Sequence, residues 1–156
     1  MGNNITHLCA KKIAYYLAQQ GFDWIDGGSI VPTVNRGPAG NDLDAEVSST
    51  PLPKILVHCD RATRTAWPGG GWRCFIDLQV VSNAEDTTEG DHDEHASAVF
   101  ELFMDRDTAV TALSLLPGFA CFLLMATDQN LAIDGRSWVS SLALEVECAP
   151  VSETAV

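Results

Sequence analysis

Two histidines and two carboxylates at the start of one predicted helix have the clearest capacity for chemistry in this chain. The group consists of Asp91, His92, Glu94 and His95. Joined by His58 and Cys59 from an earlier segment, these side chains could ligate zinc or manganese. The helix dipole also favours carboxylates in a first turn without any metal, and no His-Glu-x-x-His or Cys-x-x-Cys pattern accompanies them. We therefore interpret both histidines as solvated and expect neither metal nor cofactor, with a small metal-dependent hydrolase as the alternative.

Nucleophilic catalysis would need a cysteine or serine held beside a base. Cys59 beside His58 is the nearest such pair in the sequence, but adjacent residues of a strand point to opposite faces and do not meet. No nucleophile elbow is recognisable. The glycines 69–71 lack the Lys-Ser/Thr ending of a phosphate loop and precede a strand, where that loop precedes a helix. We expect no catalytic residue and no enzymatic activity.

The stretch 72–103 predicts a strand, an acidic turn and a helix in succession. Apolar residues alternate at period two from Trp72 to Val80, which is typical of a half-buried strand. Residues 82–90 are polar and favour a turn. Asp91 is a predicted N-cap, with Glu94 three residues later as in a capping box.

The order of the remaining elements predicts an α+β fold. We expect a mostly antiparallel sheet of about four strands, with two or three helices packed on one face. One domain spans 1–150, with a long irregular loop at 26–53 and a frayed tail at 151–156. The predicted helices are 5–19, 91–105 and 107–116, and the predicted strands are 54–59, 72–82, 120–127 and 138–148, with a short strand at 29–34 inside the loop.

The charge balance disfavours partners that are bound through their phosphates. The net charge is −12, so non-specific binding to nucleic acid or to an anionic membrane surface is disfavoured. Nine carboxylates and a single arginine lie between residues 85 and 107. The five cysteines are odd in number and scattered, which favours synthesis in a reducing cytoplasm, where a buried thiol behaves as a small apolar residue. No apolar run is long enough to span a bilayer, and we expect no membrane partner.

Two sets of residues are candidates for contacts. The tryptophans favour packing at strand ends or against a neighbouring subunit over stacking on sugars or bases, and we predict Trp67, Trp72 and Trp138 as oligomer contacts. The acidic turn is either a solvated face or a surface that repels polyanions. On the second interpretation its carboxylates face a channel or its rim, and the candidates are Glu85, Asp86, Glu89 and Asp91.

The chain resembles bacteriophage tail-terminator or tail-completion proteins, which are small subunits of the neck. The resembling pieces are the helix 5–19, the segment 52–59, the strand 72–82, residues 84–88 with Asp91 and His92, and the closing segment 136–148. Segment 26–51 has no counterpart in the family. The resemblance implies an α+β subunit without catalytic residues, which forms a ring, often of six copies, at the head-proximal end of a tail tube.

On this resemblance the partners are further copies of the chain, the tail tube and head-connector proteins, and the location is the virion after synthesis in the host cytoplasm. DNA would pass through the ring without being specifically bound, and negative charge along the channel would keep the duplex from adhering. An acidic binding module that mimics DNA is a further alternative.

Overall fold

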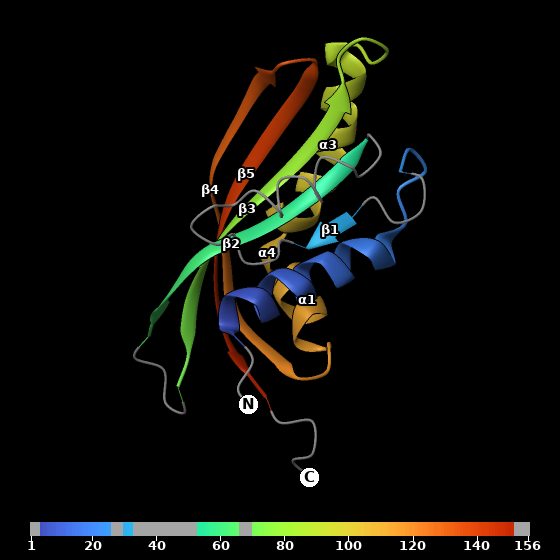
Figure 1. Cartoon of the computed structure of the whole chain (residues 1–156). Coiled ribbons are helices and arrows are strands. Elements are labelled where there is room, and N and C mark those ends of the chain that lie inside the picture. The colour runs from blue at the N-terminus through green and yellow to red at the C-terminus, as the bar shows by residue number, and fades with distance from the viewer. Residues whose placement is uncertain (1–3, 26–29, 33–52, 66–69, 152–156) are drawn as a thin grey trace.

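Three helices cover one face of a five-stranded sheet in the computed structural model, which describes residues 4–25, 30–32, 53–65 and 70–151 (Figure 1). The strand order is β1-β2-β3-β5-β4. In chain order the elements are α1 (Ile5–Gln20), β1 (Ile30–Pro32), β2 (Lys54–Arg64), β3 (Trp72–Asn83), α3 (Glu89–Met104), α4 (Arg106–Ser114), β4 (Phe119–Asp134) and β5 (Ser137–Pro150).

The predicted α+β class is confirmed. Strands β2, β3, β5 and β4 pair antiparallel, and the consecutive strands β2 and β3 are neighbours in the sheet. The short strand predicted at 29–34 is present as β1 (Ile30–Pro32), and it adds a fifth strand, which pairs parallel with β2. Residues 26–29 and 33–52 of the expected loop, and the expected tail from residue 152, lie outside the described part of the chain.

The core lies between the helices and one face of the sheet. Period-two alternation in β3 and β5 turns Leu78 and Leu142 toward the helices, and both are almost fully buried. From the helical side Ile13, Val99 and Phe103 meet them in the same apolar cluster. No helix in the described ranges is both long and apolar enough to cross a bilayer.

Strands β4 and β5 form a hairpin that is longer than the sequence pattern predicts. The expected strands 120–127 and 138–148 extend to 119–134 and 137–150. Polar residues at 128–130 interrupt the apolar pattern, yet their backbones continue to pair with β5. The hairpin turns at Gly135, whose φ of 61° suits the first position of a two-residue turn matched to strand twist.

The start of α3 corrects the predicted cap. The N-cap is Thr88 and not Asp91, because the Thr88 side chain accepts a hydrogen bond from the Asp91 backbone N–H at 3.1 Å. Asp91 therefore lies in the first turn, where its charge faces the positive end of the helix dipole.

Candidate functional site: the acidic end of the sheet

The acidic turn is fixed to the end of the sheet by backbone pairing. Asn83 at the end of β3 pairs with Ser137 of β5, and the Ala84 N–H donates to the Arg136 carbonyl at 2.8 Å. The Asn83 side chain accepts a hydrogen bond from the Glu85 N–H at 2.9 Å, which closes a local turn. The end of β3, the start of α3 and the β4–β5 turn consequently lie together at one end of the molecule, at the top of Figure 1.

All four acidic candidates are exposed at this end. They are Glu85, Asp86, Glu89 and Asp91. Glu85 faces a cation that lies outside the acidic segment, since Arg136 Nη1 of the β4–β5 turn lies 3.3 Å from Glu85 Oε1. Both side chains are more than half exposed, so solvent screens this pair and it contributes little to stability. The remaining carboxylates give this end a negative surface.

His92 is buried, so the prediction that it is solvated is wrong. Its ring is fully inaccessible, with Nδ1 2.8 Å from Ser82 Oγ on β3 and Nε2 2.9 Å from Ser140 Oγ on β5. The imidazole therefore ties the first turn of α3 to two neighbouring strands. Because both nitrogens are engaged by hydroxyls, His92 is not available as a metal ligand in this arrangement.

Burial lowers the pKa of His92, and the nearby His95 lowers it further against a smaller opposing effect of Asp93. The neutral ring is thus the favoured form, with one nitrogen donating to a serine hydroxyl and the other accepting. Trp138 lies beside the same ring at a centroid distance of 6.4 Å, and its indole N–H donates to the Thr87 carbonyl at 2.9 Å. The side chains of His92 and Trp138 therefore fix the acidic turn to the end of the sheet.

The three tryptophans predicted as oligomer contacts have different settings. Trp67 lies outside the described residues. Trp72 is half-buried and packs against the core. The Arg64 guanidinium lies over its ring, 5.0 Å from the ring centroid. Trp138 is half-buried and bonds within its own chain. A subunit contact through any of them stays a prediction.

The ligand set of the alternative hydrolase is not brought together. His95 stacks on Trp24 with ring centroids 4.4 Å apart and the planes 12° from parallel, while His92 is held by its two serines. His58 and Cys59 belong to β2, and only Cys59 faces the core. In the described ranges, a different group has the proximity of a metal site, and it consists of Cys9, Cys74 and Cys148.

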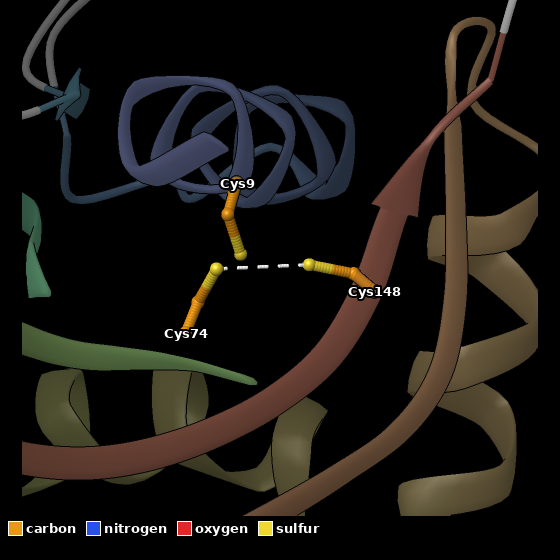
Figure 2. Close-up of side chains that lie close together, drawn as sticks. All are labelled: Cys9, Cys74 and Cys148. Carbon is orange, nitrogen blue, oxygen red and sulfur yellow. Dashed lines mark hydrogen bonds between the residues drawn. The ribbon is translucent and has the colours of Figure 1, made fainter. Parts of the chain in front are cut away.

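That cysteine cluster joins three elements beneath α1. Cys9 points down from α1 toward Cys74 of β3 and Cys148 of β5, as Figure 2 shows, and all three side chains are fully buried. The Cys74 and Cys148 sulfur atoms are 3.7 Å apart, and all three sulfurs lie within 4.8 Å of one another. Thiol donors from Cys74 and Cys9 lower the pKa of Cys148, against the effect of burial. All five cysteines are buried, as expected for thiols that behave as small apolar residues.

The edge strand β4 presents exposed apolar side chains. In the described part of the chain no strand pairs with its outer edge. Leu131 and Ile133 near the hairpin turn are 45% and 61% exposed. Next to Met125 of the same strand is a groove of about 450 Å³ lined by Phe103, Met104, Arg106, Leu124, Met125 and Ala126. Two β-bulges interrupt this strand, a device common at sheet edges.

Comparison with known proteins identifies the fold alone. No protein-family model and no curated protein matches the chain. Among solved structures, the fold is similar to that of a chain in the structure described as "Virion of native gene transfer agent (GTA) particle", with a TM-score of 0.51 and 12% sequence identity. The similarity covers 93% of this chain and 98% of the other. The two proteins therefore share an architecture over nearly their whole lengths.

Sequence reasoning missed both the burial of His92 and the cysteine cluster, for different reasons. The burial of His92 has a signal, since residues 92, 96, 99 and 103 continue one helical stripe. The cysteine cluster has none, because its members are 65 and 74 residues apart along the chain. The pairing of β3 with β5 brings Cys74 and Cys148 together, and the docking of α1 on the sheet adds Cys9.

Proposed function

We propose that this chain is a structural subunit of a phage-type virion, without enzymatic activity, which forms a homo-oligomeric ring that completes the tail tube at the neck. The observation that carries the proposal is the fold shared with a chain of the gene transfer agent virion over nearly the full length of both. The sequence resemblance to tail-terminator and tail-completion proteins supports the position at the neck. The engaged nitrogens of His92 weigh against the hydrolase alternative.

The edge strand β4 supports ring formation. A ring needs a contact between two different surfaces of neighbouring copies, and an uncovered sheet edge offers both backbone groups and side chains for it. Leu131 and Ile133 add apolar area at the projecting tip of the hairpin. The methionines of the adjoining groove, Met104 and Met125, adapt to a partner more readily than branched side chains do.

The acidic end supports a role in which DNA passes and is not held. The four exposed carboxylates are anchored on a rigid support, because His92 and Trp138 fix the turn that carries them. A ring, which we expect to have six copies, would gather these charges around one opening. Like charges brought together repel one another, so raised salt should favour closure by screening them over about 8–10 Å.

The partners in this proposal are the tail tube and the head-connector proteins, and the free subunit is a monomer when dilute. Light scattering across a salt series, with and without purified tail tubes, measures the mass that tests this. We expect a monomer at low salt and a ring-sized mass when salt is raised or tubes are present. A monomer under every condition that also fails to join tubes would refute the ring. Capture of a basic DNA-binding protein by such a monomer would favour the DNA-mimic alternative.

A further inference from the structure

We propose that Cys9, Cys74 and Cys148 form a buried site for one trivalent thiophilic ion of the arsenic(III) class, which bonds all three sulfurs and ties α1 to the sheet. The cluster lies between α1 and strands β3 and β5 (Figure 2), and its sulfurs lie within 4.8 Å of one another. Because the site lies inside the core, it is independent of the proposed ring.

The number of sulfurs selects an ion with three ligands. Cys59 of β2 pairs with Ile76 of β3. Cys148 pairs with Trp72, from the other side of β3. These two cysteines are therefore separated by β3 and by four residues along it, so Cys59 does not join the cluster. Structural zinc sites need four ligands, whereas arsenic(III) bonds three thiolates and keeps a lone pair in the remaining direction.

The positions of the three sulfurs suit short bonds to one ion. The Sγ atoms of Cys74 and Cys148 are 3.7 Å apart, and the Cys9 Sγ lies within 4.8 Å of both. An ion in the plane of three sulfurs, with bonds of about 2.3 Å as in zinc–thiolate sites, would hold those sulfurs about 4.0 Å apart. A pyramidal ion draws them slightly closer, so binding requires only side-chain adjustment, mainly of Cys9.

Charge balance selects a trivalent ion. Cysteines bind such ions as thiolates, and net charge is costly in an apolar core. Three thiolates carry three negative charges, which arsenic(III) cancels, whereas Zn²⁺ would leave one negative charge and copper(I) two. All three side chains are fully buried, so the neutral complex is the one that these surroundings favour.

Arsenous acid supplies the ion as a small molecule that is uncharged near neutral pH. It exchanges its three hydroxyl groups for the three cysteine sulfurs. Each step forms one As–S bond, breaks one As–O bond and releases one water, which carries away the thiol proton, and no atom changes its oxidation state. Hydrogen bonds from the Cys74 and Cys9 thiols lower the pKa of Cys148, so Cys148 is the thiolate that begins the exchange.

The test is to refold the reduced full-length chain with or without one equivalent of arsenite, and then to remove unbound arsenic by gel filtration. Refolding gives the reagent access to a site that is closed in the folded chain. We expect one arsenic per chain by elemental analysis, and a higher melting temperature than without arsenite, because an unfolded chain offers no assembled site. X-ray absorption at the arsenic edge should show three sulfur neighbours and no oxygen.

Cys59 and Cys121 supply the matched controls, because both are buried core cysteines outside the cluster. Cys59→Ala and Cys121→Ala should retain arsenic with three sulfur neighbours, whereas Cys9→Ala and Cys74→Ala should lose it with little change in circular dichroism. Wild-type protein that refolds without retaining arsenic would overturn the site, whatever the variants do. Undiminished retention by Cys9→Ala, or an oxygen neighbour in the wild-type spectrum, would overturn the set of three sulfur ligands.

Discussion

At the scale of single residues, His92 is the side chain whose removal should cost most at the acidic end. His92→Ala takes away two hydrogen bonds and leaves the Ser82 and Ser140 hydroxyls buried without their partner. We expect a loss of about 2–4 kcal/mol in the free energy of unfolding, measured by chemical denaturation. His95→Ala is the comparison, since it removes only a stack on Trp24, worth about 1 kcal/mol. Equal losses in the two variants would contradict the buried network.

The same residue should make stability depend on pH. Because the folded-state pKa of His92 is lowered below its ordinary value of 6.5, the unfolded chain binds a proton below that pH which the folded chain does not. Stability should therefore fall as pH drops below 6.5, by at most about 1.4 kcal/mol per pH unit from this group. Between about pH 7 and pH 5, the free energy of unfolding measured by chemical denaturation should change less with pH for His92→Gln than for the wild type. The same pH dependence of the unfolding free energy in both proteins would show that His92 does not contribute to it.

Residue types alone predicted the exposed carboxylates but not the buried groups. Glu85 and Asp91 lie on the surface as their charge dictates. His92 was assigned to solvent because its neighbours along the chain are charged, whereas its burial follows from its position on the face of α3 that turns toward the sheet. Cys9 comes near Cys74 only through tertiary packing, which no local spacing encodes.

At the scale of elements, period-two and helical patterns predicted the strands and helices wherever one face is apolar. Strand β3 is the clearest example, since it matches its predicted bounds to within one residue. The outer part of β4, residues 128–134, was not predicted, because residues 128–133 are all exposed. A strand without a buried face carries no alternation to detect.

That outer part of β4 should carry the contact between subunits. Ile133→Asp places a charge in the proposed interface, which should abolish ring formation while circular dichroism and melting stay close to those of the wild type. Tyr15→Asp is the matched control, because Tyr15 is 55% exposed on α1 and lies away from the β4 edge. Native mass spectrometry at the salt concentration that closes the wild-type ring gives the answer. A ring that forms equally well with Ile133→Asp would exclude the hairpin tip as the contact.

At the scale of the whole molecule, the acidic end should determine whether the ring holds DNA. Replacing Glu85, Asp86, Glu89 and Asp91 with lysine changes the charge by +8 per subunit, at positions that are all exposed. The fold should survive, and the assembled ring should now retain DNA, with retention falling as salt rises. A gel-shift titration compares the variant with the wild type. If the lysine ring ignores DNA at low salt, these carboxylates do not face the path of the duplex.

The most direct measurement of the central claim is electron microscopy of the purified protein mixed with tail tubes that lack their terminal subunits. The proposal predicts closed rings at raised salt and a single ring capping one end of each tube. Ile133→Asp should leave the tube ends bare, and Tyr15→Asp should cap them. Tube ends that stay bare with the wild-type protein, together with the absence of free rings at every salt concentration, would contradict the assignment of this chain as a ring-forming virion subunit.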